Sequence, residues 1–329
     1  KPVGKPRLLV ENMRPGRPIG FNSAGAYYFT TSFSWRGDIY VANFVTDGQK
    51  AEAERQLIQR NEGFKSLPSW SSDGQRLAYT LGGEYLVIRE IETANEQKIR
   101  LSPRLTLIGG RIQWTSTNSV ALYGHDFKSR GIFSIDVQSG DVAPLVHGSP
   151  EEFSIPQFKL SRDGKTAYYL RSRDVVARDL NSKNERIIHQ GKFHSLALSP
   201  DGEQLAVASN SAIELLSTED DSHEQLYKAA ETQVIPAHAG VTWTDSDNSI
   251  IFALADATSY HPKWNAPKSK VSRVSVDNKS VTSLGVEIDG LRQMSVHPDG
   301  HQIAYSKKPL NGGAEVWVLE DFLPPLSKQ

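Results

Sequence analysis

The stretch Leu196–Ser209, LALSPDGEQLAVAS, decides the fold. Two runs that alternate apolar with small or polar residues flank the turn Ser199-Pro200-Asp201-Gly202. Asp tolerates a left-handed backbone, Gly adopts it without steric cost, and Pro presets φ before them. The stretch therefore predicts a β-hairpin.

Seven copies of this hairpin run along the 329-residue chain. They are FNSAGAYYFTT (from Phe21), WSSDGQRLAYTL (Trp70), WTSTNSVALYG (Trp114), LSRDGKTAYYL (Leu160), LSPDGEQLAVAS (Leu198), WTDSDNSIIFAL (Trp243) and VHPDGHQIAYSK (Val296). Successive turn residues, from Gly25 to Gly300, lie 38 to 52 residues apart. Four-stranded propeller blades repeat every 40 to 50 residues or so.

Further β-rich runs follow each hairpin and complete a four-stranded unit. The third run is DIYVANF (from Asp38) in the first unit and AEVWVLE (from Ala314) in the last. A short fourth run closes every unit except the last, and KPRLLVEN (from Lys5) is predicted to supply that missing strand. Such pairing would close the ring and remove its open sheet edge. We therefore predict an all-β, seven-bladed propeller as a single domain over residues 1–329. A six-bladed ring is the alternative, because the NSAG turn is the weakest copy and residues 44–64 are irregular.

Composition and charge narrow the functional classes. The chain has 37 Lys and Arg against 38 Asp and Glu, a net charge of −1, so we expect no nucleic-acid partner. No apolar run approaches the roughly 20 residues of a membrane helix, so no membrane insertion is expected. There are no cysteines, which excludes disulfides and thiolate metal sites. Residue 1 is Lys, so we expect a processed product or a piece of a longer chain.

The hairpin pattern Trp/Leu-Ser-x-Asp-Gly-x-x-Ile/Leu-Ala-Tyr/Phe resembles the TolB-type, WD-like propeller repeat of bacteria. Its best copies are Trp70–Tyr79, Leu198–Val207 and Val296–Tyr305. The resemblance covers nearly the whole chain and implies a propeller, with the bacterial periplasm as the favoured location. Members of this family serve as scaffold proteins, sensory parts of larger regulators and non-catalytic lids of peptidases. The repeat carries no functional residue set of its own, so function must be argued from a site.

Catalytic signatures are absent from the sequence. It contains no Gly-x-Ser-x-Gly elbow, phosphate loop, His-Glu-x-x-His or EF-hand pattern. The aspartates of SSDG, SRDG, SPDG and HPDG are predicted to be turn residues that bond local backbone. We therefore predict no catalytic residue, no metal and no cofactor, although His194 and His238 begin neighbouring units and are worth testing together.

Candidate binding residues come from the loops that lead into the innermost strands, which we call the lead-in loops. These loops open on the face opposite the Ser-x-Asp-Gly turns. They are predicted to place mostly basic side chains around the channel mouth: Arg17, Lys65, Arg111, Gln157, His194, His238 and Arg292. Converging Arg donors suit carboxylates and phosphates. The alternative is a water-filled channel that simply tolerates polar side chains.

Two longer loops carry aromatic and basic residues. The insertion 255–270 contains Tyr260, His261 and Trp264, and the loop TSFSWRGD contains Trp35 and Arg36. Exposed loops of this composition are frequent recognition elements. Alternatively, each loop folds onto its own blade and buries its tryptophan.

Together these features favour a non-enzymatic binding or scaffold propeller. The expected partner is a protein or peptide segment, or a small anionic ligand, on the face that carries the lead-in loops. Two alternatives stay open: a propeller enzyme, such as a lyase or hydrolase acting on an acidic sugar, and a sensory domain of a larger regulator.

Overall fold

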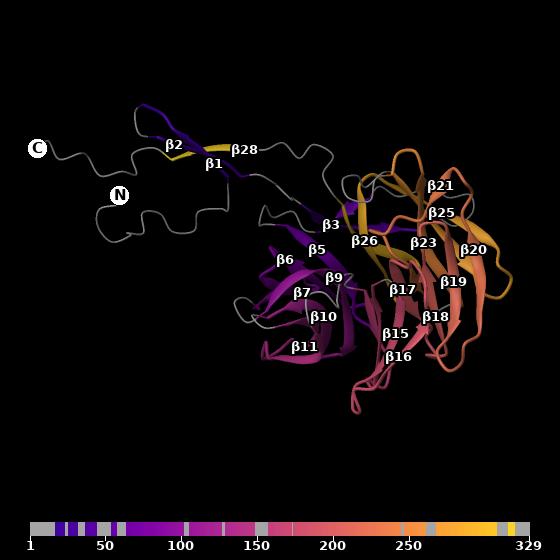
Figure 1. Ribbon diagram of the computed structural model, residues 1–329. Helices are drawn as coiled ribbons and strands as arrows, with labels where there is room; N and C mark the ends of the chain where they lie inside the picture. The colour runs from indigo at the N-terminus through magenta and orange to yellow at the C-terminus, as the bar shows by residue number, and fades with distance from the viewer. Residues whose placement is uncertain are drawn as a thin grey trace, which may run out of the picture. The chain divides into compact units, whose positions relative to one another are not determined.

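The computed structural model describes residues 17–23, 26–31, 37–44, 54–57, 64–101, 105–126, 129–148, 157–172, 174–244, 247–260, 268–307 and 315–319. Every regular element in these ranges is a β-strand. The described ranges contain no helix long and apolar enough to cross a membrane. Contacts group the chain into two compact units, residues 37–308 and residues 1–36 with 309–329 (Figure 1). That both units form one domain, as the sequence predicts, stays a prediction.

The smaller unit is a three-stranded antiparallel sheet in the order β1-β2-β28. Its strands are β1 (Arg17–Phe21), β2 (Tyr27–Thr31) and β28 (Glu315–Leu319). Tyr27 pairs with Leu319 and Thr31 with Glu315, so the strand near the end of the chain lies beside the hairpin near its start.

The larger unit contains six antiparallel sheets, which we number as blades 1 to 6. Blade 1 holds β5 (Lys65–Trp70), β6 (Arg76–Leu81), β7 (Tyr85–Glu90) and β8 (Glu96–Arg100). Blade 2 holds β9 (Thr106–Ser116), β10 (Ser119–His125), β11 (Arg130–Asp136) and β12 (Val142–Gly148). Blade 3 holds β13 (Phe158–Leu160), β14 (Thr166–Arg171), β15 (Asp174–Asp179) and β16 (Glu185–His189).

Blades 4 to 6 have the same four-stranded plan, except that blade 5 contains a fifth strand and blade 6 takes two of its strands from the start of the larger unit. Blade 4 holds β17 (Ser195–Leu198), β18 (Gln204–Ala208), β19 (Ala212–Ser217) and β20 (His223–Lys228). Blade 5 holds β21 (Gln233–Val234), β22 (Thr242–Trp243), β23 (Ser249–Asp256), β24 (Ser269–Ser275) and β25 (Val281–Ile288). Blade 6 holds β26 (Leu291–Val296), β27 (Gln302–Lys307), β3 (Asp38–Asn43) and β4 (Arg55–Gln56).

The protein is therefore a β-propeller, and its six blades match the alternative rather than the preferred count of seven. The difference lies in strand pairing. The seven-blade prediction pairs β2 with β3 and β27 with β28. In the structure β27 pairs with β3, and β2 pairs with β28. Blade 6 closes the ring by combining β26 and β27 with β3 and β4, which come from opposite ends of the larger unit. The strand from Lys5, which the sequence predicts to close the ring, lies outside the described residues.

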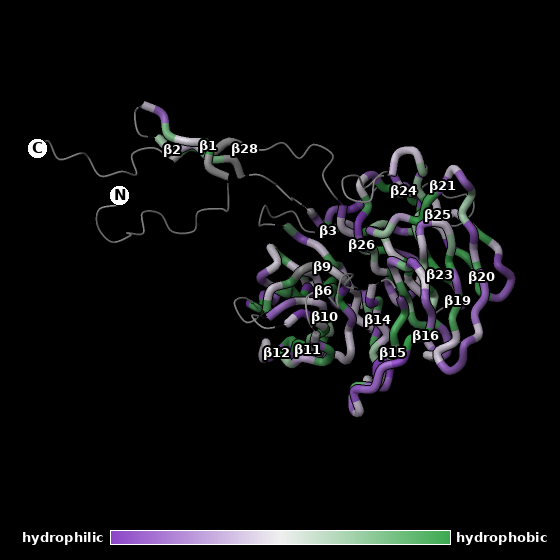
Figure 2. Tube along the Cα trace, viewed as in Figure 1, coloured by the Kyte–Doolittle hydropathy of each residue, from purple (hydrophilic) through white to green (hydrophobic). Residues whose placement is uncertain are grey.

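The core lies between neighbouring blades. Each blade alternates its buried side chains between two faces, and apolar clusters join one blade to the next. Tyr79, Tyr169 and Tyr305 occupy matching places on β6, β14 and β27 and are almost fully buried. Figure 2 shows hydrophobic residues along strands of the larger unit and hydrophilic residues at several of its connecting turns.

The Ser-x-Asp-Gly turns are built as the sequence predicts. The Ser199 hydroxyl donates to Asp201 Oδ1 (2.5 Å) and accepts the Gln204 N–H (2.9 Å). The Asp201 carboxylate also accepts the Glu203 N–H (3.0 Å), and Gly202 adopts φ of 84°. Equivalent bonds recur around Asp73 and Asp163, which confirms that these aspartates shape turns.

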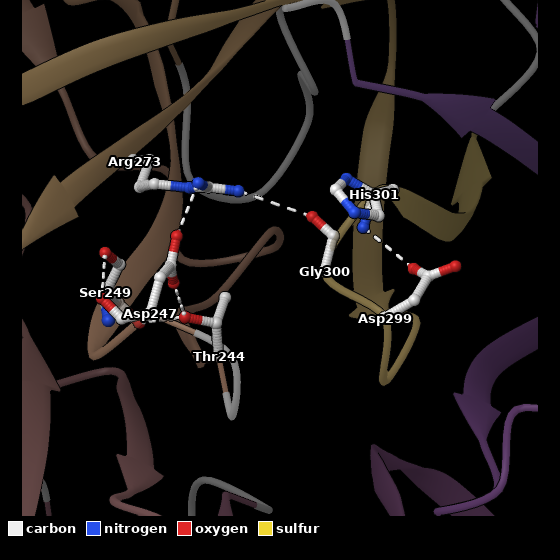
Figure 3. Close-up of polar contacts among 7 residues, drawn as sticks. All are labelled: Thr244, Asp247, Ser249, Arg273, Asp299, Gly300 and His301. Carbon is white, nitrogen blue, oxygen red and sulfur yellow. Dashed lines mark hydrogen bonds and ion pairs between the residues drawn. The ribbon is translucent and has the colours of Figure 1, made fainter.

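Polar clamps join blades where their turns meet, as between blades 5 and 6 (Figure 3). Arg273 on β24 pairs with Asp247 Oδ2 (2.5 Å) and donates to the Gly300 carbonyl (3.3 Å) of the next blade. The other oxygen of Asp247 accepts the Thr244 hydroxyl (2.5 Å). Asp247 therefore stabilises its own hairpin and also holds the Arg273 side chain that bonds to the next blade.

Candidate functional site

The innermost strands surround the propeller axis in a closed ring. Contacts run from β5 to β9, β13, β17, β22 and β26, and return to β5. Four of these strands, or the segment just before them, carry a left-handed residue near the axis: Leu67, Gly110, Gly240 and Gln293. These irregular backbones turn polar groups toward neighbouring blades. The Gln293 N–H donates to the His238 carbonyl (2.8 Å), and its side-chain oxygen accepts the Leu67 N–H (3.4 Å).

Arg111 crosses the channel from blade 2 and bonds to three other blades. Its Nε donates to Gln157 Oε1 of blade 3 (3.1 Å). One terminal nitrogen donates to the Met294 carbonyl of blade 6 and the other to the Ala239 carbonyl of blade 5, both at 3.1 Å. The planar guanidinium fork suits three acceptors in different directions.

The charge of Arg111 is not balanced by a carboxylate among the described residues, since all three partners are uncharged. Burial lowers the pKa of Arg111 to about 10, because removing the guanidinium from water penalises its charged form. This value is far above neutral pH, so Arg111 keeps its charge. The channel therefore has a permanent positive charge near its axis.

Two pockets follow one another along the channel, from the level of Arg111 toward the face of the Ser-x-Asp-Gly turns. A narrow cavity of about 50 Å³ adjoins Arg111 and is lined by Pro68, Lys159, Gln293 and Met294, among others. A wider pocket of about 260 Å³ follows it on the face of the Ser-x-Asp-Gly turns, and we call it the axial pocket. The face with the turns thus has a recess at the axis.

Three tryptophans line the axial pocket at the ends of innermost strands: Trp70, Trp114 and Trp243. Lys159 and His297 also line it, and the described lining contains no carboxylate. Trp114 is held by a bond from its indole N–H to the Ser69 carbonyl (3.0 Å). The Trp70 and His297 rings meet edge to face, with centroids 4.7 Å apart. The pocket wall is therefore aromatic, locally fixed and weakly cationic.

The predicted lead-in residues have diverse environments. Arg111 and Gln157 are in direct contact. Lys65 is 2% exposed and pairs with Asp38 of blade 6 (2.9 Å), so its charge is used inside the fold. Arg17 begins β1, which belongs to none of the six blades, so it does not lie in a loop leading into one of their innermost strands as predicted.

His194, His238 and Arg292 stay at the predicted ends of their blades. His194 leads into β17, and its backbone N–H donates to the Ala208 carbonyl (2.9 Å). The His238 ring lies 6.3 Å from the Tyr260 ring, and the Tyr260 hydroxyl accepts the Ala237 N–H (3.3 Å). Burial lowers the pKa of Arg292 and raises the pKa of Tyr260. Tyr260 thus packs onto its own blade, while His261, Trp264, Trp35 and Arg36 lie outside the described residues.

Sequence reasoning missed the axial pocket. Its signal was present, because three hairpin copies begin with Trp at the same repeat position. Within the described ranges, no three histidine, aspartate or glutamate side chains lie close enough together to hold a metal ion.

Comparison with known proteins supports the propeller fold. No family model matches the chain, and no curated protein matches its sequence. A protein assigned as TolB from Agrobacterium tumefaciens superposes with a TM-score of 0.60 at 18% identity, over 84% of this chain and 99% of that one. TolB from Acinetobacter baumannii gives 0.53 at 12% identity, over 86% and 66%.

Propellers with other roles are similar to nearly the same degree. Oligogalacturonate lyase from Vibrio parahaemolyticus gives a TM-score of 0.52 at 13% identity, over 90% of this chain and 97% of that one. A chain of a nidogen/laminin complex gives 0.52 at 9% identity, over 77% and 93%. The shared feature is a propeller fold, and at these identities it carries no shared activity.

Proposed function

We propose that this propeller is a non-enzymatic binding module that holds an extended protein segment in its axial pocket. The observation that carries the proposal is the tryptophan-lined recess of about 260 Å³ on the channel axis. Trp114 is partly exposed, whereas Trp70 and Trp243 are each 7% exposed and offer a bound segment only part of their rings. Contacts with aromatic rings contribute to binding energy at protein interfaces.

The charge of the pocket favours an acidic segment. Lys159 lines both the narrow cavity and the axial pocket, and the described lining of each contains no carboxylate. Arg111 adds a permanent charge beside the narrow cavity. In a recess of reduced polarity, such charges attract a carboxylate more strongly than they would in bulk water. A segment that ends in, or contains, an acidic side chain is therefore the expected partner.

The comparisons support protein binding in general terms only, through the TolB proteins and the nidogen/laminin complex. The lead-in face stays a second proposed surface, with His194, His238 and Arg292 at its loops. The aromatic loop residues Trp35, Arg36, His261 and Trp264 are proposed to extend it. The similarity to oligogalacturonate lyase keeps one alternative, cleavage of an acidic sugar chain.

A peptide-display selection tests the axial pocket even though the natural partner is unidentified. Peptides enriched on the full chain are titrated against Lys159→Glu and against Lys165→Glu. The second variant is the control, because Lys165 lies in the same blade with its side chain 67% exposed. We expect acidic peptides whose affinity falls at least about tenfold in Lys159→Glu and little in Lys165→Glu, since a like charge would oppose the segment.

The other outcomes identify the alternatives. Equal affinity for both variants, with loss in Arg292→Gln or Trp264→Ala, would overturn the axial pocket in favour of the lead-in face. Release of unsaturated products from oligogalacturonate by the full chain would overturn the non-enzymatic assignment.

A further inference from the structure

A third cavity, of about 380 Å³, lies at the periphery between blades 2 and 3, and we call it the interblade pocket. Its lining is His147 on β12 of blade 2, with Tyr169, Arg171, Arg178, Lys183, Asn184 and Glu185 of blade 3. It shares no lining residue with the axial pocket. Three of its side chains are permanent cations and only one is a carboxylate, so the cavity has an excess of positive charge.

Glu185 organises the cationic side chains. Its Oε1 accepts the Tyr169 hydroxyl (2.5 Å) and Arg178 Nη1 (2.7 Å), and its Oε2 accepts Arg171 Nη1 (2.5 Å). Burial opposes ionisation of this carboxyl, but the three hydrogen bonds outweigh burial and lower its pKa. Each guanidinium uses one terminal nitrogen for these bonds, and a guanidinium has five N–H donors. The carboxylate therefore holds two arginines side by side.

Arg178 shows unused donor capacity at this place. Its Nε is buried and has no hydrogen-bond partner among the described residues. An N–H group that is removed from water without a partner costs free energy. Arg89 and Arg273, on the corresponding strands of blades 1 and 5, also have a buried Nε without a partner among the described residues, so this feature belongs to the blade repeat. A ligand in the cavity would therefore use the terminal nitrogens of Arg178.

Lys183 adds the third cation from a strained position. It has φ of 63° in the turn between β15 and β16, where Gly or Asn is the usual residue. Figure 2 shows this turn as hydrophilic. Lys279 occupies the corresponding turn of blade 5 with φ of 59°.

The two lysines differ in their partners. Lys279 pairs with Glu224 of blade 4 (2.7 Å), and this ion pair joins blades 4 and 5. No described carboxylate pairs with Lys183, which lines the interblade pocket instead. The left-handed backbone itself belongs to the turn, because Ala94 and Gly140 adopt it at the same position of blades 1 and 2. What distinguishes Lys183 is therefore its charge beside the cavity and not its backbone.

We propose that the interblade pocket binds a small molecule through a phosphate monoester group. Two arginine forks held by Glu185 and one lysine approach the cavity from different strands and a turn, which suits the several oxygens of a tetrahedral group. The three permanent cations and one carboxylate of the lining sum to a charge of +2, which balances the charge of a phosphate monoester near neutral pH. A single carboxylate would satisfy only part of this donor set.

Isothermal titration of the full chain with glycerol 3-phosphate tests the proposal, with glycerol and succinate as comparison ligands. We expect binding of the phosphate at millimolar concentrations or below, weakened by added salt, and none of glycerol. Lys183→Asn should weaken this binding at least about threefold. Asn tolerates the left-handed backbone, so the variant keeps the fold.

Lys279→Asn is the matched control, since it removes the same charge at the same turn position of another blade. It should leave phosphate affinity unchanged, while Arg178→Gln should weaken it about tenfold or more. Equal weakening by both lysine variants, or tighter binding of succinate than of the phosphate, would overturn the proposal. No detectable phosphate binding by the unmodified protein would also overturn it. Because the ligands and residues differ, none of these results depends on peptide binding at the axial pocket.

Discussion

At the scale of single residues, the sequence could predict that Arg111 lies near the axis but not what it would bind. Its position near the axis follows from its place just before a predicted innermost strand. Its contact with Gln157 joins the neighbouring blades 2 and 3. Its other acceptors, the carbonyls of Ala239 and Met294, are 128 and 183 residues away. Those contacts depend on the closed ring, which local pattern does not specify. Lys65 shows the same limit, because its partner Asp38 comes from the strand that closes the ring.

The Arg111 guanidinium lies directly beside Gly240, and this close approach gives a prediction at the scale of single residues. Gly240 has φ of 73°, and a Cβ there would lie 1.6 Å from an Arg111 terminal nitrogen. Gly240→Ala should therefore lower the free energy of unfolding by about 3 kcal/mol, from backbone strain and a displaced guanidinium. Urea unfolding followed by tryptophan fluorescence measures the loss.

Gly164→Ala separates the two contributions. Gly164 has φ of 69°, but a Cβ at this position would meet nothing within 4 Å. This variant should lose only about 1 kcal/mol, from backbone strain alone. Equal losses in the two variants would show that Arg111 does not occupy the space beside Gly240.

At the scale of elements, the turns could be predicted almost completely, because their chemistry is local. The Ser, Asp and Gly of each hairpin are contiguous, and their hydrogen bonds span five residues or fewer. The axial pocket could not be predicted in the same way. It combines Trp70, Trp114 and Trp243 from three blades, and their convergence depends on how many blades close the ring.

The turn carboxylates should make stability depend on pH in the acid range. The Ser199 hydroxyl, followed by the Glu203 N–H, lowers the pKa of Asp201 below its usual 3.8. A lowered folded-state pKa means that the stabilisation is present above about pH 4 and is lost as the pH falls through the folded-state value. Asp201→Ala should therefore lower the free energy of unfolding by about 1 kcal/mol at pH 7, and by less at pH 3.

Asp221→Ala is the control for this experiment. Asp221 is an exposed carboxylate in the β19–β20 turn, and its side chain has no hydrogen bond among the described residues. Its replacement should change stability little at either pH. A loss in Asp201→Ala that is as large at pH 3 as at pH 7 would show that turn geometry, not the carboxylate charge, is responsible.

At the scale of the whole molecule, the sequence predicted a propeller but not its closing pairs. The first hairpin and the last strand have the pattern of a blade, and pattern alone pairs β2 with β3 and β27 with β28. Period-2 alternation says which face of a strand is buried and not which neighbour it takes. The observed exchange of partners removes one blade and leaves β1, β2 and β28 as a separate sheet.

This exchange predicts which parts of the chain the propeller needs. Residues 37–308 contain all six blades, so this fragment should fold alone and unfold in one cooperative transition. Residues 45–308 lack β3, whose six residue pairs with β27 close blade 6. That fragment should aggregate or unfold at lower denaturant concentration, because it exposes the edge of β27 and opens the apolar interface beside it. Circular dichroism and urea unfolding of the two fragments measure the difference. A seven-bladed ring would need β1, β2 and β28, and failure of residues 37–308 to fold would therefore favour seven blades over six.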